Sequence, residues 1–160
     1  MIEKSDLLNF IRAEIQIIKH LGAKAKQEFW NYRPHAKQRS LLELMQYLSH
    51  AGATSVEYIQ SGNWNHAKAN ADDALKVNLS NFSQAMDEQL AKIERLVDAM
   101  GDLSQKEVKT PAGQVLKADA ALIDLPLKFF VAYRMQLFLY LKGCGLQELG
   151  TSNCWRGVDA

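Results

Sequence analysis

The sequence predicts an all-α protein: a four-helix bundle with a long connection between its second and third helices. Four segments carry apolar residues at every third or fourth position, which is the spacing of one helix face. A helix-start motif opens the second segment, and no convincing pair of strands is evident. A chain of 160 residues, 48% of them hydrophobic, can bury one core, so we expect a single domain over residues 1–160.

The first helix is expected over residues 3–29, where an apolar stripe extends from Leu7 to Phe29. It ends before Arg33, because Pro34 disfavours helical backbone in the residue that precedes it. A turn is therefore expected to lead from this helix into the second one.

The second helix is expected over residues 40–60. Ser40 and Glu43 fit a capping box, in which the serine hydroxyl and the glutamate carboxylate each accept a backbone N–H of the other residue. Residues 61–78 have no sustained period and are rich in Asn, Asp and Gly, so they form a long connection. Such a connection permits a crossover, which would let the second and third helices run parallel.

The third helix is expected over residues 79–100, with Gly101 as its C-cap. The turn-forming stretch TPAGQ follows, flanked by short extended pieces in EVK and VLK. The fourth helix is expected over residues 119–142. It contains Pro126, which should kink or split it near Leu122 because proline cannot complete the helical hydrogen-bond pattern.

Composition argues against several classes of partner. Lys and Arg total 19 against 18 Asp and Glu, a net charge of +1, so the chain lacks the basic excess that a nucleic-acid backbone requires. No stretch reaches about eighteen uninterrupted apolar residues, and the N-terminus does not have the form of a signal peptide. We therefore expect no nucleic acid, no membrane association and a cytoplasmic location.

Both cysteines, Cys144 and Cys154, lie near the C-terminus. Two thiols in a chain of this size do not make a disulfide framework, so free thiols in a reducing compartment are favoured over a pair. The last residues are expected to form an irregular tail that Trp155 packs against the bundle.

No motif of metal or nucleotide chemistry is evident. Glu-x-x-His, His-Glu-x-x-His, Cys-x-x-Cys and the glycine-rich phosphate-binding patterns are all missing from the sequence. On a helical wheel, His50 falls on the polar face of the second helix, so we expect a solvated side chain there rather than an interior ligand. The residues by themselves indicate no metal and no cofactor.

The fourth helix contains FFVAYRMQLFLYL, an apolar segment with polar groups on one face. That face carries Phe129, Tyr133, Gln136 and Tyr140. Aromatic residues at helical spacing are more often plain core, and that alternative stays open. Buried polar atoms need hydrogen-bond partners, however, and Tyr47 on the second helix is placed to supply one. We expect a small polar-aromatic cluster between the second and fourth helices.

The other sides of the fourth helix predict different contacts. Arg134 projects away from Tyr133, and a structural salt bridge or a carbonyl contact is favoured for it. Val131, Met135 and Phe138 also point away, which makes the helix apolar nearly all round. Such a helix must be covered on both sides, by the rest of the monomer or by a second subunit. We predict a homodimer.

Two stretches resemble the DinB-like (DinB/YfiT) superfamily of four-helix bundles. RPHAKQRSLLELMQYLSHAG is similar to the second-helix region of that family, and LIDLPLKFFVAYRMQLFLYLKGCG is similar to its final helix. The matching residues are Ser40, Glu43, Leu44 and Leu48 in the first stretch, and Arg134, Gln136, Leu137, Tyr140, Leu141 and Gly145 in the second. The resemblance covers most of the chain in order and length, although its specific motifs lie only in these two helices.

The resemblance implies a metal site that the residues here do not provide. Family members commonly hold nickel or zinc with three histidines, and those positions fall on Tyr47, Phe129 and Tyr133; the glycine of the final-helix motif is Met135. Phenylalanine cannot coordinate a metal, and neutral tyrosine is a poor replacement for imidazole. We expect a cavity refilled by aromatic rings, with Tyr47, Phe129, Tyr133 and Gln136 forming a pocket at the lost metal site.

Two functions stay open on this basis. One is a metal-free DinB-like protein that binds a small molecule or acts through assembly. The other is a DinB-like enzyme of the thiol-dependent transferase or hydrolase type, with a modified pocket in which Tyr47 or Tyr133 donates hydrogen bonds. A form of the latter would keep a metal through Asp124 or His50, and the helical wheel argues against both residues as ligands.

Overall fold

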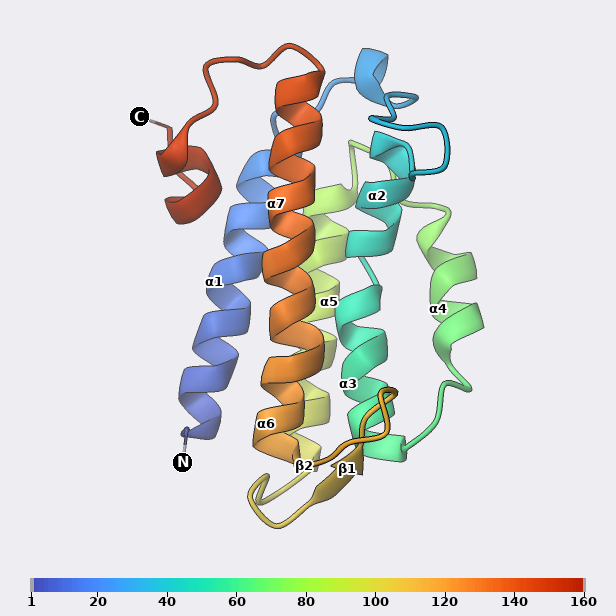
Figure 1. Cartoon of the computed structure of the whole chain (residues 1–160), viewed down its shortest axis with the longest axis vertical. Coiled ribbons are helices and arrows are strands. Elements are labelled where there is room, and N and C mark those ends of the chain that lie inside the picture. The colour runs from blue at the N-terminus through green and yellow to red at the C-terminus, as the bar shows by residue number, and fades with distance from the viewer. Residues whose placement is uncertain (1, 160) are drawn as a thin grey trace.

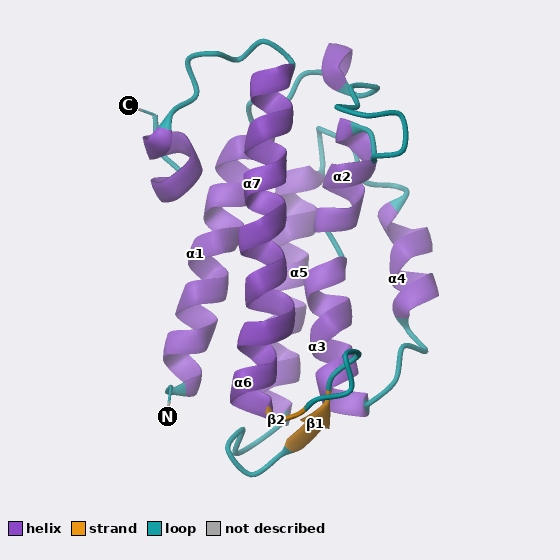
Figure 2. Cartoon of the chain, viewed as in Figure 1, coloured by secondary structure: helices purple, strands orange, loops and turns teal. Residues whose placement is uncertain are grey.

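The structure, a computed structural model, describes residues 2–159 and consists mainly of helices arranged in four columns (Figures 1 and 2). One hydrophobic core lies between the columns. The predicted helical bundle is therefore confirmed. The columns are α1 (Lys4–Gly22), α2 with α3 (Leu41–Leu48 and Ala51–Ser61), α5 (Phe82–Ala99), and α6 with α7 (Ala118–Leu122 and Lys128–Gly143).

The long connection between the second and third columns is a crossover. It contains the short helix α4 (Ala67–Ala74), which lies outside the α2–α3 column and returns the chain to the opposite end of the bundle (Figure 1). As a result α2–α3 and α5 run parallel, while α1 and α7 run the other way (Figure 1). The sequence allowed both this parallel arrangement and a helical turn within the connection, and α4 is that helical piece.

The second column is broken, although the sequence predicted one continuous helix. α2 ends at Leu48 and α3 begins at Ala51. The buried amide of Gln89, from α5, donates to the carbonyl of Leu48 at 2.8 Å and accepts from the N–H of Ala53 at 3.1 Å. A side chain from another helix thus satisfies backbone groups on both sides of the break, which is a tertiary effect that local periodicity does not register.

The start of α2 agrees with the sequence, whereas the end of α1 does not. Glu43 N–H donates to Ser40 Oγ at 3.2 Å and Ser40 N–H donates to Glu43 Oε2 at 2.7 Å, so the capping box is confirmed. α1 ends at Gly22, and a short 3₁₀ turn, η1 (Gln27–Phe29), follows. A Cβ at Gly22 would lie 2.4 Å from Phe82, so the close approach of α5 requires glycine at the end of α1.

The last column changes its winding where proline occurs. A π-helical stretch, η2 (Ile123–Leu127), joins α6 to α7 and contains Pro126. The predicted disruption near Leu122 is therefore confirmed, and it takes the form of one wider turn, a common feature of π-bulges inside helices. This turn directly precedes the part of α7 that faces α2 and α3.

A hairpin closes one end of the bundle. The segments β1 (Glu107–Lys109) and β2 (Val115–Lys117) pair antiparallel, with Val108 opposite Leu116. The expected extended pieces are present, and they do form a strand pair, which the sequence did not suggest convincingly. Tyr58 of α3 donates to the carbonyl of Lys109 at 2.6 Å and ties the hairpin to the bundle.

The C-terminal tail contains a π-helical turn, η3 (Ser152–Arg156), that packs beside α1 (Figure 1). Leu149 and Cys154 are the buried apolar residues of this tail. Trp155 is 66% exposed, and its ring centroid lies 5.3 Å from the guanidinium carbon of Arg134, so it contacts the bundle on one side without being buried against it. Its neighbour Cys154 has the buried position instead, because the turn directs that side chain inward.

Arg134 of α7 holds the tail from the inside. Its side chain is buried, with Nε 2.8 Å from Glu14 Oε2 of α1, and its Nη1 donates to the carbonyl of Cys154. Nε and Oε2 lie at ion-pair distance without the angle of a hydrogen bond. The predicted salt bridge and carbonyl contact are both present. Within residues 2–159, no helix is both long and apolar enough to cross a membrane.

Candidate ligand cleft

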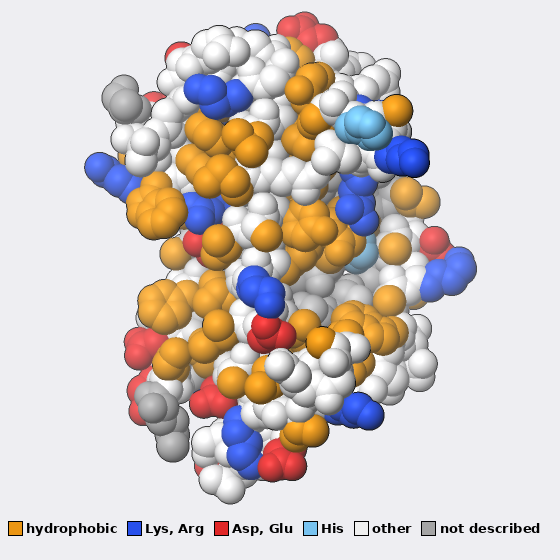
Figure 3. Space-filling model, viewed as in Figure 1, with side chains coloured by type: hydrophobic (Ala, Val, Ile, Leu, Met, Phe, Trp, Pro, Cys, Tyr) orange, Lys and Arg blue, Asp and Glu red, His pale blue; other side chains and the backbone are white. Residues whose placement is uncertain are grey.

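A cleft of about 470 Å³ opens between the α2–α3 column and the η2–α7 column. The view in Figure 3 shows this hollow, with hydrophobic side chains along it and basic and histidine side chains at one margin. Its volume lies in the range of ordinary small-molecule sites, and its walls are mostly apolar. The cleft is therefore the candidate functional site.

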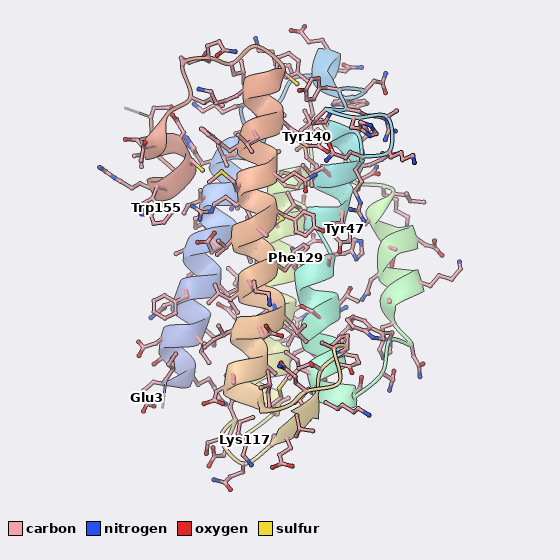
Figure 4. The ribbon with its side chains drawn as sticks, in the orientation of Figure 1. Glu3, Tyr47, Lys117, Phe129, Tyr140 and Trp155 are labelled. Atoms are coloured by element: carbon pink, nitrogen blue, oxygen red, sulfur yellow. The ribbon has the colours of Figure 1, made fainter. Side chains whose placement is uncertain are left out.

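Three aromatic rings form the wall nearest to the break in the second column. Tyr47 comes from α2, and Phe129 and Tyr133 come from successive turns of α7. The ring centroids of Tyr47 lie 5.1 Å from Tyr133 and 5.5 Å from Phe129, both edge to face, and those of Phe129 and Tyr133 are 4.8 Å apart. Figure 4 shows Tyr47 and Phe129 between the two columns. Three of the four predicted pocket residues thus lie together.

The fourth predicted residue, Gln136, lies outside the cleft lining. Its Nε2 donates to Tyr140 Oη at 3.0 Å, and that hydroxyl donates to the backbone carbonyl of Arg39 at 3.0 Å. Tyr140 itself is buried. Gln136 is therefore connected to the loop before α2 by two hydrogen bonds in series and does not face the cleft.

Arg39 lies beside this site, in the lining of a neighbouring hollow and not of the cleft itself, and the sequence did not single it out. Its guanidinium carbon lies 3.9 Å from the ring centroid of Tyr47, so the planar cation covers one side of that ring. Within residues 2–159 it forms no salt bridge. The sequence signal for it is the basic loop RPHAKQR directly before the capping box, but nothing local showed that this loop meets Tyr47.

His50 lies on the cleft, and the expectation that it is solvated on a polar face is wrong. It is half-buried, its ring centroid lies 5.7 Å from that of Tyr47, and its Nδ1 is 3.4 Å from Thr54 Oγ1. The helical wheel misplaced His50 because it assumes a constant rotation of about 100° per residue, and the helix breaks at this residue. Burial lowers the pKa of His50, and Arg39 and Lys92 lower it further, so the imidazole is neutral at neutral pH.

The tyrosine beside it is also uncharged. Burial raises the pKa of Tyr47, the Tyr133 hydroxyl raises it further, and Arg39 opposes these effects. The hydroxyl therefore keeps its proton at neutral pH and is available as a hydrogen-bond donor. The aromatic wall thus offers apolar surface and the two phenolic hydroxyls of Tyr47 and Tyr133, next to the neutral imidazole of His50.

The donors at this site do not fit a nickel or zinc ion. Tyr47, Phe129 and Tyr133 occupy the positions that the resemblance aligns with histidine ligands, and none supplies an imidazole. Asp124 lines the cleft, although the helical wheel argued against it as a ligand. Its carboxylate forms a salt bridge with Lys128 at 2.6 Å and is therefore not free to bind a metal. Among the described residues 2–159, no three His, Cys, Asp or Glu side chains gather to hold a metal.

Neither cysteine belongs to the cleft lining. Cys144 and Cys154 are unpaired in the structure, in agreement with the expectation of free thiols. Burial raises the pKa of both thiols, which keeps them in the protonated and less nucleophilic form. A nucleophilic cysteine is therefore not part of the candidate site.

The fold and site define a four-helix bundle with one crossover and an aromatic cleft between its second and last columns. No family model matches the sequence, and a search of curated proteins found no match. Solved structures do match. The crystal structure of YjoA, a DinB-like protein from Bacillus subtilis, aligns at TM-score 0.68 and 18% identity, covering 91% of this chain and 95% of that one.

A second crystal structure, described as a member of the DinB family from Exiguobacterium sibiricum, aligns at TM-score 0.67 and 19% identity. That alignment covers 89% of this chain and 92% of the other. The chain therefore has the fold of DinB-like proteins, and the predicted DinB-like bundle is confirmed as a fold. At these identities the likeness concerns the fold alone.

Proposed function

We propose that this chain is a divergent DinB-like protein that binds a small organic molecule in its cleft without a metal ion. The observation that supports it most strongly is the mutual packing of Tyr47, Phe129 and Tyr133, with centroids 4.8 to 5.5 Å apart. Edge-to-face rings stabilise each other and take up the space in which a metal and its ligands would lie. The cleft remains open beside them.

The cleft wall suits an apolar, flat ligand. Trp64 lines it and stacks on Tyr58 with centroids 4.4 Å apart and planes 19° from parallel, which holds the indole in place. Each apolar Å² that a ligand covers contributes about 25 cal/mol. Tyr47 and His50 then supply the few polar contacts that orient a bound molecule.

Binding of the neutral fluorophore N-phenyl-1-naphthylamine tests this proposal. We expect a saturable rise in fluorescence with the wild type. Ala132→Trp should abolish it, because Ala132 lines the cleft but is exposed and tolerates a larger side chain. The matched control is Ala99→Trp, the same change at an exposed position of α5. Equal binding by both variants, or none by the wild type, would overturn the proposal.

A second proposal concerns assembly. Val131, Met135 and Leu139 form an exposed stripe on the outer face of α7, 41%, 41% and 57% exposed. Phe138, which the sequence placed on that face, is half-buried instead, and Leu139 extends the stripe. We propose that a second copy of the chain covers this stripe, since a large apolar helix face favours a partner.

Sedimentation at micromolar concentration tests the homodimer. We expect the mass of two chains for the wild type and of one chain for Met135→Glu, which places a charge at the centre of the stripe. The control Gln84→Glu adds a charge on the exposed side of α5 and should remain dimeric. A monomeric wild type would remove the proposal. A single domain over residues 1–160 and a cytoplasmic location stay predictions.

A further inference from the structure

Tyr47 and His50 form a wall shared by two hollows. One side of it is the 470 Å³ cleft, and the other is a neighbouring hollow of about 390 Å³ that Arg33, Lys37 and Arg39 line. The apolar cleft and a surface rich in cations are therefore neighbours, separated by the side chains of Tyr47 and His50. A ligand that fills the cleft and extends past Tyr47 would have one end at the basic loop.

The charges around the two hollows are not balanced. Lys128 is paired with Asp124 at 2.6 Å, and Arg33 is paired with Glu43 at 2.8 Å. These pairs use the carboxylates that line the two hollows, Asp124 and Glu43. Arg39 makes no salt bridge and its N–H groups make no hydrogen bond within residues 2–159. Within the described residues, Arg39 and Lys37 thus line the neighbouring hollow without a counterion, and Arg39 is the one whose guanidinium covers Tyr47.

The position of Arg39 is organised in advance. Its carbonyl accepts a hydrogen bond from the buried Tyr140, which in turn accepts one from Gln136, so the backbone of Arg39 is tied to α7. Its guanidinium carbon lies 3.9 Å from the ring centroid of Tyr47, which orients the planar group. A guanidinium whose planar face lies on an aromatic ring keeps the N–H groups at its edge free. Those N–H groups can donate two parallel hydrogen bonds to a carboxylate or a sulfonate.

We infer that the cleft binds an anionic ligand, with a flat apolar body against Tyr47, Phe129 and Tyr133 and a single oxyanion head on Arg39. This inference rests on the proposed ligand-binding function and specifies its ligand class. Bases, quaternary amines and neutral hydrocarbons lack the head group that the unpaired guanidinium recognises. The lowered pKa of His50, to which Arg39 contributes, agrees with a positive potential at this end of the cleft.

Two fluorophores that share one apolar body isolate the role of charge. 8-Anilinonaphthalene-1-sulfonate carries a sulfonate that N-phenyl-1-naphthylamine lacks. We expect the wild type to bind the sulfonate about tenfold more tightly, the effect of one charge-assisted contact. Arg39→Gln should remove this preference and leave the affinity for the neutral probe within about twofold. The control Arg95→Gln removes an exposed arginine of α5 and should keep the preference.

The outcomes separate the two proposals. If the neutral probe does not bind, or binds Ala132→Trp equally well, the ligand-binding function itself fails. If the neutral probe binds in the cleft but the wild type shows no preference for the sulfonate, the anionic ligand class fails and the cleft stands. Equal losses for both probes in Arg39→Gln would also overturn the inference, because they indicate a structural role.

A measurement on the wild type covers the case in which Arg39→Gln does not fold. Raising the salt concentration from about 0.1 M to 1 M shortens the screening length from about 10 Å to 3 Å. The preference for the sulfonate should fall severalfold over this range, while neutral-probe affinity does not decrease. A preference that is independent of salt would contradict a charge contact at Arg39.

Discussion

The hydroxyl of Tyr140 donates a hydrogen bond of 3.0 Å to the backbone carbonyl of Arg39, which lies 101 residues earlier in the chain. This contact joins the last column of the bundle to the loop before α2. It also connects Tyr140 and Gln136 of α7 to Arg39, whose guanidinium covers one side of the Tyr47 ring. The Tyr140 hydroxyl therefore contributes to the stability of the fold and also holds the backbone of Arg39, the residue proposed to bind the ligand's anionic group.

Tyr140→Phe should lower the free energy of unfolding by about 1 kcal/mol, the usual net contribution of one hydrogen bond. Urea denaturation measures the change. The matched control is Tyr32→Phe, because within residues 2–159 the Tyr32 hydroxyl makes no hydrogen bond, so its loss should change stability by less than about 0.5 kcal/mol. Equal effects at the two positions would show that the contact with Arg39 contributes nothing.

Gln89→Leu should lower the free energy of unfolding more than Tyr140→Phe does. The buried Gln89 forms hydrogen bonds with two backbone groups at the break between α2 and α3. Without it, the carbonyl of Leu48 and the N–H of Ala53 lose their partner, and each unsatisfied group costs about 1 to 3 kcal/mol. We expect a loss of about 2 to 4 kcal/mol in urea denaturation. Gln84→Leu, at an exposed position of the same helix, is the control and should be nearly neutral.

The ion pair between the buried Arg134 and the half-buried Glu14 predicts non-additive mutations. Burial raises the pKa of Glu14, and the nearby guanidinium only partly offsets this, so desolvation exceeds attraction. Arg134→Met leaves the carboxylate without its cation and should cost about 3 kcal/mol. The double variant Glu14→Leu with Arg134→Met should be more stable than Arg134→Met alone. A double variant whose loss equals the sum of the single losses would contradict this coupling.

His50 makes stability depend on pH. Its pKa is below the ordinary 6.5 in the folded protein, so the unfolded chain binds more protons between the two values. The free energy of unfolding should therefore decrease as pH falls from 7 through 6.5 and below, and this contribution is present in full only above that value. His50→Gln should reduce the slope, whereas His35→Gln, in an exposed loop, should keep it. Denaturant unfolding at several pH values supplies the comparison.

The elements that sequence predicted best are those with a local cause. The capping box of Ser40 and Glu43 joins residues that are three positions apart. Pro126 disrupts the helix that contains it, whatever that helix packs against. Both features appear in the structure as expected. The aromatic face of Phe129 and Tyr133 was also predictable, because it depends only on helical spacing.

The elements that sequence missed have causes elsewhere in the chain. The backbone groups at the break after Leu48 are satisfied by Gln89, which follows it by 41 residues and belongs to another helix. His50 lies on the cleft only because of that break, so a wheel drawn through a continuous helix placed it wrongly. Arg39 reaches Tyr47 from a loop whose path is held by Tyr140. These placements required the tertiary structure.

The central claim is that the cleft operates without the metal ion that the resemblance implies. The metal content of untagged protein, purified without chelators and passed through gel filtration, tests it most directly by elemental analysis. We predict nickel, zinc and iron each far below one atom per chain, because the aligned positions are Tyr47, Phe129 and Tyr133 and supply no imidazole. One retained equivalent of any of these metals per chain would contradict the account.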